Sequence, residues 1–223
     1  MYQSDVFVKD AFYAVIWTQS VKNPHMDFER RFFAAFYKKG FIFSVNQRRP
    51  TYAFTKEPVT TIYLRESEPL PNHIFKLMVE LLPFAENAFL KFFYVYQIIE
   101  YLMFSTFKVK YEEIKSGLNA VPDMSVTALR DYLRRFSDAA KEDTRINILL
   151  NAKSSETEMM ANAILDAIGV DKVGFSFADS VYKVRNLVFH DFTSVQGCEQ
   201  EIDALSESLI RYLVARYIGW KEV

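Results

Sequence analysis

The chain has 223 residues, half of them hydrophobic and 16% aromatic, and a formal net charge of -1. This composition excludes an intrinsically disordered protein and supplies a sizeable core. The single cysteine, Cys198, excludes an internal disulfide and a cysteine-based zinc site, and it fits a reducing cytoplasm, which is the location we expect. Because the net charge is close to zero, nucleic-acid binding would need a local patch of positive charge.

The first 71 residues predict a small α+β region of unknown role. Their helical patterns cover residues 5–17 and 27–39, and stretches rich in β-branched and aromatic residues, typical of strands, cover 41–45, 51–55 and 59–64. Residues 66–72, with Pro69 and Pro71, indicate a connector. We therefore predict two parts, residues 1–71 and residues 72–223.

Residues 72–223 carry only helical patterns, so we predict a mainly α fold with a C-terminal helical bundle. The expected helices cover residues 74–82, 84–107, 110–118, 123–141, 155–169, 176–190 and 196–219. Ser155 and Glu158 have the spacing of a capping box, and Gly169 marks the end of the helix that they open. The 123–141 helix has an apolar stripe made of Val126, Leu129, Leu133, Phe136 and Ala140.

The stretch 88–107 is long and apolar enough to be compared with a membrane span. However, Lys91, Gln97 and Glu100 lie within it. A charge at the centre of a bilayer costs about 2.5–3.5 kcal/mol on insertion scales. We therefore expect a buried core helix and no membrane association.

The stretch Arg185-Asn186-Leu187-Val188-Phe189-His190 holds the candidate catalytic residues Arg185, Asn186 and His190. The guanidinium of arginine matches phosphate oxygens, and histidine gains and loses a proton near neutral pH. On an ideal helix the core face is formed by Phe177, Val181, Val184 and Val188. Asn186 and His190 then point away from this core face, with Arg185 at its flank, so we expect the first two to face solvent or a second molecule.

The Arg185-x4-His190 spacing, with a polar residue directly after the arginine, resembles the signature of the HEPN superfamily. The run 93–102 looks like the early helix of its Apea-like branch, which tends to carry an aromatic-Gln-x-x-Glu-Tyr-Leu pattern. The resemblance covers roughly residues 72–223. It implies a helical bundle in which this early helix packs against the helix that bears the signature.

The resemblance also implies metal-independent RNA cleavage by a homodimer, with two signatures in one cleft, in phage defence or growth arrest. His190 would then be the general base or acid, Arg185 would stabilise the phosphate, and Asn186 would orient His190 or bind a phosphate oxygen. We expect no cofactor and no metal, because His25, His73 and His190 are too dispersed to form a metal site. The attack needs a ribose 2′-OH, so DNA would not be cut.

Four supporting residues complete the predicted site. Gln97 and Glu100 belong to the polar stripe of an otherwise apolar helix. A buried Glu is costly unless paired, so Glu100 either pairs with Arg185 or reaches solvent. Tyr182 either stacks on a base or packs at the dimer contact. Asp191 directly follows His190, where many relatives have a small residue, and its charge would repel a phosphate.

Three interpretations of the sequence stay open. The first is an endoribonuclease, and the second is a catalytically silent HEPN module that binds nucleotide, RNA or a protein partner through the same surface. The third is a structural helical dimer in which Arg185 and His190 are incidental. The second is favoured somewhat by four acidic residues in the last helix, Glu199, Glu201, Asp203 and Glu207. Arg130, Arg134 and Arg135 form either an RNA-binding cluster or an ordinary solvated face.

Overall fold

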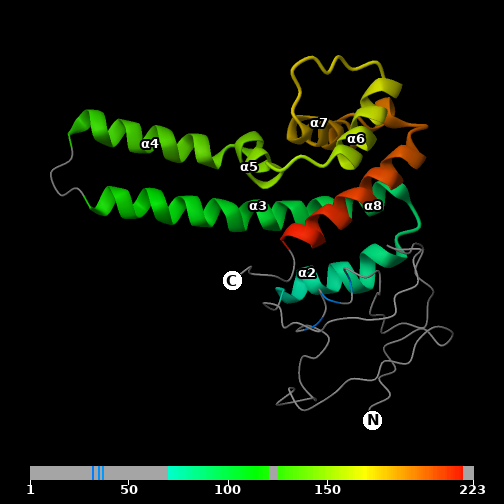
Figure 1. Cartoon of the computed structure of the whole chain (residues 1–223), viewed down its shortest axis with the longest axis horizontal. Coiled ribbons are helices and arrows are strands. Elements are labelled where there is room, and N and C mark those ends of the chain that lie inside the picture. Colours follow the sequence, from blue (N-terminus) through cyan, green and yellow to red (C-terminus); the bar gives the residue numbers. More distant parts are fainter. Residues whose placement is uncertain (1–31, 33–34, 36, 38–69, 121–124, 218–223) are drawn as a thin grey trace, which may run out of the picture. The chain divides into compact units, whose positions relative to one another are not determined.

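The computed structural model describes residues 70–120 and 125–217, together with Phe32, Ala35 and Tyr37. This part of the chain is mainly helical and contains no strand, which confirms the predicted fold class for it (Figure 1). Its α-helices are α2 (Asn72–Lys76), α3 (Ala88–Asn119), α4 (Val126–Ala140), α5 (Glu142–Leu149), α6 (Ser155–Ala167), α7 (Phe177–His190) and α8 (Glu199–Arg216). The predicted α+β region lies outside the described residues apart from those three, and it stays a prediction.

The chain divides into two compact units, Met1–Val95 with Ser206–Val223, and Tyr96–Leu205. The predicted boundary at residue 71 stays a prediction. In the first unit, Lys91 of α3 is almost fully buried, and its Nζ lies 3.6 Å from a carboxylate oxygen of Glu207 in α8. The burial of Lys91 therefore comes with a paired charge. None of the helices formed by the described residues is long and apolar enough to cross a membrane.

The segment before α3 differs from the predicted helix 74–82. The α-helix α2 passes into a π-helical turn, Leu77–Leu81, and then into a 3₁₀ turn, Leu82–Phe84. Pro83 lies in the first turn of that 3₁₀ segment instead of following the end of the helix. Proline is tolerated there because the first N–H groups of a helical turn have no partner within it.

Helix α3 is one helix where the sequence predicted two, at 84–107 and 110–118. The hydroxyls of Ser105 and Thr106 donate to the carbonyl oxygens of Tyr101 and Leu102 inside this continuous helix. The end predicted near Gly117 is confirmed within two residues, since α3 ends at Asn119. A Cβ on Gly117 would lie 3.0 Å from the Tyr132 hydroxyl oxygen, so the glycine leaves room for that side chain of α4.

Helix α5 was missed, because no helix was predicted between the end of the 123–141 helix and residue 155. The predicted end at Lys141 is confirmed within one residue, since α4 ends at Ala140 and the extended backbone of Lys141 (ψ 139°) separates it from α5. Helix α4 begins later than predicted, because the Ser125 side chain caps it by accepting from the Ala128 N–H. This division sets the position of Glu142, the first residue of α5.

The capping box predicted for α6 is wrong by one residue. Ser154 is the cap, and its Oγ accepts from the Thr157 N–H, while the Glu158 carboxylate pairs with Lys153 at 2.9 Å. The helix end near Gly169 is confirmed. Gly169 adopts φ +72°, and the backbone bonds of the following Val170 and of Gly169 itself form a Schellman motif. Helix α8 begins at Glu199, three residues after its predicted start.

Helices α6 and α7 form the best packed pair of the second unit. Ala161 and Ile164 of α6 and Val181 and Val184 of α7 are fully buried. Among the described residues, a side-chain hydrogen bond crosses this face: the Ser180 hydroxyl donates to Asn162 Oδ1 at 2.9 Å. The buried Ser180 hydroxyl therefore has a hydrogen-bond partner. The helix that carries the signature is therefore anchored along its length.

We expect Ile164→Ala to lower the free energy of unfolding by about 2–5 kcal/mol, because it leaves a cavity at a fully buried site. Met159→Ala on the exposed face of the same helix should change it by less than about 0.5 kcal/mol. Urea unfolding followed by far-UV circular dichroism measures both values. Similar losses in the two variants would contradict the assignment of α6–α7 as the core.

Candidate functional site

The start of α7 fixes the register of the signature residues. Ser176 and Asp179 form a capping box, with Asp179 N–H donating to Ser176 Oγ and Ser176 N–H donating to Asp179 Oδ2. Burial would raise the pKa of Asp179, but hydrogen bonds from Ser176 and Asn147 outweigh it and lower that pKa below its ordinary value. Asn147 belongs to α5, so the same contacts tie α5 to the start of α7.

The buried face of α7 differs in part from the predicted one. Phe177, Val181 and Val184 are buried as predicted, but Val188 is half-buried. Leu187 is buried instead. Seven residues separate Leu187 from Ser180, so both lie on the side where Ser180 bonds to α6. His190 is exposed and Asn186 is half-buried, in agreement with their predicted direction away from the core.

The Arg185 side chain lies at the centre of the candidate site and is only 16% exposed. Its guanidinium carbon lies 5.2 Å from the ring centroids of both Tyr96 and Phe189, which are themselves in contact. Guanidinium is planar and weakly hydrated, so it stacks on aromatic faces at a modest desolvation cost. Two aromatic rings, from α3 and from α7 itself, thus hold the cation in place.

Two carboxylates balance the charge of Arg185. Its Nη2 lies 3.4 Å from Glu142 Oε1 and 3.9 Å from Glu100 Oε1. Glu100 therefore meets both of the alternatives considered for it, because it contacts Arg185 while its side chain remains 41% exposed. Glu142, at 28% exposure, is the nearer and more buried partner.

Glu142 was missed by the sequence analysis, although it connects three residues of the site. Besides contacting Arg185, its carboxylate accepts from the hydroxyls of Tyr96 (3.1 Å) and Tyr182 (3.4 Å). Burial, followed by the negative charge of Glu142, raises the pKa of Tyr96 well above its ordinary value. Tyr96 therefore stays protonated and donates to Glu142, which excludes it as a base. In the sequence Glu142 is one of many acidic residues near a helix end, and no local signal distinguishes it.

Arg185 also contacts the other two predicted catalytic residues. Its Nη1 donates to Asn186 Oδ1 at 3.0 Å and lies 3.2 Å from His190 Nε2. Because guanidinium can only donate, Nε2 must be the acceptor wherever this contact is a hydrogen bond.

The remaining supporting residues divide into two groups. Gln97 joins the cluster through Glu100, whose Oε2 accepts from Gln97 Nε2 at 2.8 Å, and Tyr182 joins it through Glu142. The Asp191 carboxylate instead accepts from the hydroxyls of Ser194 and Thr193, and these bonds lower its pKa. Asp191 thus stabilises the 3₁₀ turn Phe192–Val195.

The described residues contain no group of three His, Cys, Asp or Glu side chains able to hold a metal ion. A pocket of about 460 Å³ on α5 is lined by Asp143, Thr144, Asn147, Ile148 and Asn151, and none of the predicted site residues lines it. At the signature, the guanidinium of Arg185 lies within hydrogen-bond distance of both the Asn186 amide and the His190 imidazole.

Comparison with known proteins does not assign the chain to a family. No family model, no curated protein and no solved structure matches it. The HEPN resemblance therefore stays a prediction, carried by the Arg185–His190 spacing and by the helix that supplies Tyr96, Gln97 and Glu100.

We expect Glu142→Gln to lower the free energy of unfolding by about 1–3 kcal/mol, because it weakens the charged bonds around the largely buried Arg185. Glu113→Gln, in an exposed ion pair with Lys110, is the matched control and should cost less than about 1 kcal/mol. Chemical denaturation compares the two variants. Equal effects would show that Glu142 does not hold Arg185.

Proposed function

We propose that the chain is a metal-independent endoribonuclease of HEPN type that acts as a homodimer. The observation that supports this most is the contact of Arg185 Nη1 with His190 Nε2 at 3.2 Å, with Asn186 bonded to the same nitrogen. A cation that can bind phosphate, Arg185, and a side chain that can transfer a proton, His190, lie side by side and are close enough to act on one phosphodiester. In the proposed reaction, His190 takes part in the proton transfers to or from the ribose and the leaving oxygen.

In the proposed reaction, a base takes the proton of a ribose 2′-OH, and the oxygen attacks the adjacent phosphorus. The bond to the 5′-oxygen breaks as an acid protonates it, which leaves a 2′,3′-cyclic phosphate and a free 5′-OH. Arg185 stabilises the charge that develops on the phosphoryl oxygens. Asn186 holds the guanidinium or donates its amide to the same oxygens. To bind these oxygens, Nη1 of Arg185 must break its contact with Nε2 of His190, and the imidazole is then free to approach the 2′-OH.

The proposed homodimer follows from this need for two proton-transfer groups. One signature supplies one histidine, while the reaction uses both a base and an acid. The exposure of His190 supports a second signature as the source of the other group, since its imidazole is open to an approaching molecule. A closed twofold dimer is also the commonest oligomer. The proposed setting is the cytoplasm, which the single cysteine favours, and phage defence or growth arrest, which the resemblance implies.

A second candidate function is supported by the carboxylates around Arg185. Glu100 and Glu142 both approach the guanidinium, so an RNA phosphate would have to displace them or bind beside them. A cation held in this way suits a catalytically silent module, in which Arg185 is structural. The exposed His190 and the half-buried Asn186 would then contact a nucleotide, RNA or a protein partner.

We expect the purified chain to cleave a mixed structured RNA in EDTA, and His190→Ala to lower the rate about 10²–10⁴-fold, the usual contribution of general acid–base catalysis. Gln196→Ala, on an exposed position outside the site, should cleave like the wild type. Products should end in 2′,3′-cyclic phosphate, and a 2′-deoxy substitution at the cut position should block the reaction.

The competing outcomes separate the two candidates. Equal background cleavage by wild type and His190→Ala, with RNA still bound by the folded protein, would favour the silent module. Absence of both cleavage and binding would contradict both. Because Arg185 is largely buried, Arg185→Ala is informative only beside a measurement of its unfolding free energy.

A further inference from the structure

The hairpin formed by α4 and the distal half of α3 carries one apolar heptad stripe on each helix. Both stripes keep the alternating spacing of three and four residues that is typical of coiled-coil seams. They consist of Phe104, Phe107, Tyr111, Ile114 and Leu118 on α3, and of Val126, Leu129, Leu133, Phe136 and Ala140 on α4. Such a spacing indicates helices that pack along their whole length against partners with the same period.

The two helices cover only one side of their stripes. The Phe136 ring of α4 contacts the rings of Phe107 and Tyr111 at 6.0 Å, and Ile114 is buried. The close approach of Tyr132 to Gly117 brings the helices together near the loop. In contrast, Val126 is 85% exposed, Leu133 61% and Phe104 60%, although each belongs to a stripe.

The most exposed members share one heptad position, which holds Phe104 on α3 and Val126 and Leu133 on α4. Tyr111 and Leu118 continue the position of Phe104 at 37% and 38% exposure, and Leu129 and Phe136, at the other position of α4, are 43% and 38% exposed. The helices meet through the rings of Phe107, Tyr111 and Phe136. Figure 1 shows α3 and α4 antiparallel, and the helical period then puts the most exposed positions on one side of the hairpin. We call this side the open hairpin face.

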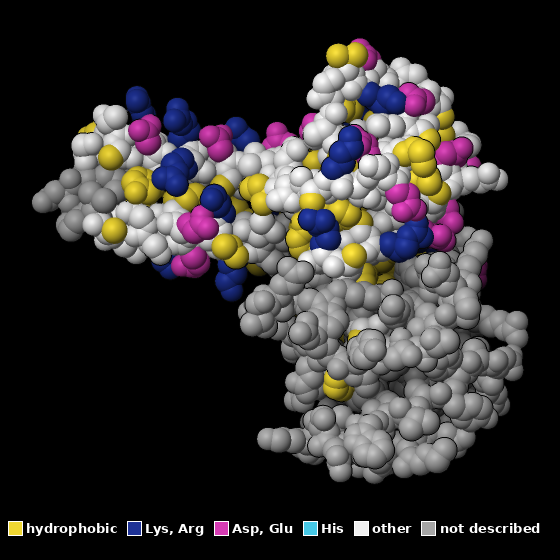
Figure 2. Space-filling model, viewed as in Figure 1, with side chains coloured by type: hydrophobic (Ala, Val, Ile, Leu, Met, Phe, Trp, Pro, Cys, Tyr) yellow, Lys and Arg dark blue, Asp and Glu magenta, His cyan; other side chains and the backbone are white. Residues whose placement is uncertain are grey.

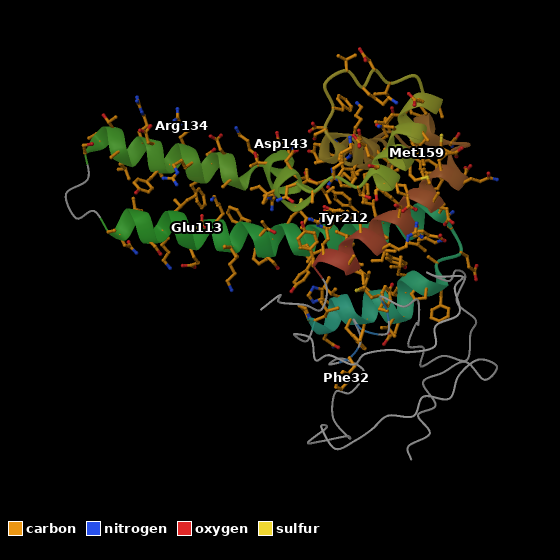
Figure 3. All side chains as sticks on the ribbon, viewed as in Figure 1. Phe32, Glu113, Arg134, Asp143, Met159 and Tyr212 are labelled. Atoms are coloured by element: carbon orange, nitrogen blue, oxygen red, sulfur yellow. The ribbon has the colours of Figure 1, made fainter. Side chains whose placement is uncertain are left out.

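Charged side chains of both signs surround the stripes, and several are paired within their own helix. Lys110 pairs with Glu113, Lys115 with Glu112, and Arg134 with Asp131, each three residues apart on its own helix. Over residues 104–140 there are six Lys and Arg against five Asp and Glu, a net charge of +1. Figure 2 shows both signs mixed with hydrophobic side chains on the hairpin, and Figure 3 marks Glu113 and Arg134 on its two helices.

This balance favours a second copy of the chain over nucleic acid. RNA binding needs a surplus of positive charge that follows the backbone, and Arg134 is instead paired within its own helix. A mixed surface of near-zero charge neither attracts a polyanion nor repels its own copy. The aliphatic members Val126, Leu129 and Leu133 also offer no ring for base stacking, whereas they suit the seam of a helical bundle.

We propose that the open hairpin face is a self-association surface, on which the hairpin of a second copy packs to complete an antiparallel four-helix bundle. The second copy brings two helices of the same period and the same exposed positions, so each stripe meets a stripe. A twofold axis relates the two faces, because one patch serves both partners. The proposal supplies a contact for the expected homodimer and does not depend on RNA cleavage.

The test measures the mass of the full chain by sedimentation velocity from low to high micromolar concentration. The wild type should have the mass of two chains. Leu133→Glu and Val126→Glu should each weaken association at least about tenfold, because each buries a charge in an apolar seam. Val173→Glu, an exposed position outside the hairpin, is the matched control and should stay dimeric.

Both test positions are exposed in one chain, so the variants should retain the far-UV circular dichroism spectrum of the wild type. A wild type that stays monomeric at every concentration would overturn the proposal, and so would a dimer that both variants leave intact. A monomer that binds single-stranded RNA through the hairpin would replace it with the nucleic-acid interpretation. Cleavage is assayed separately, so a dimer without activity would refute the proposed function alone.

Discussion

The contact between the Arg185 guanidinium and Glu142 determines how the second unit holds its candidate site. A cation with only 16% of its side chain exposed needs acceptors, and its two carboxylate partners come from two other helices. Glu142 begins α5, and Tyr96 and Glu100 belong to α3. Moving any of these helices would lose at least one of these contacts. A single charged group on α7 therefore constrains the placement of α3 and α5.

Patterns in the sequence predicted the helices, which depend on neighbouring residues. They did not predict the contacts between residues that are far apart in the sequence. The residues Arg185, Asn186 and His190 lie on one helix, as predicted, but five residues separate Arg185 from His190, so their contact depends on the reach of the arginine side chain as well as on helical spacing. Glu142 reaches the same site from another helix, and nothing in Lys141-Glu142-Asp143 indicates that contact. The continuity of α3 between Phe107 and Lys110, and the short helix α5 after Lys141, were missed because short segments carry too few apolar positions to show where one helix ends and the next begins. Asp191 shows the converse, because adjacency to His190 suggested an electrostatic role while its oxygens accept from Ser194 and Thr193.

The structural role of Arg185 and its proposed chemical role compete for the same guanidinium group. Its stability comes from carboxylates and aromatic rings, whereas phosphate binding would require the same nitrogens. The two nitrogens differ in this respect, since Nη2 contacts Glu142 and Glu100 while Nη1 contacts Asn186 and His190. Phosphate can therefore engage Nη1 without breaking the ion pairs at Nη2. In the proposed reaction, Arg185 would therefore anchor α7 through Nη2 and bind phosphate through Nη1, once His190 has moved away from Nη1.

Helix α3 serves two purposes in succession along its length. Residues 96–100 supply Tyr96, Gln97 and Glu100 to the candidate site, and the stripe that starts at Phe104 belongs to the hairpin. Heptad spacing keeps an apolar face on one side of a helix only while the helix is continuous. The unbroken passage through Ser105 and Thr106 therefore links the two segments in a fixed rotational register. A second chain that packs on the hairpin would contact the same continuous helix that carries Tyr96. Association would then be coupled to the geometry of the site through α3.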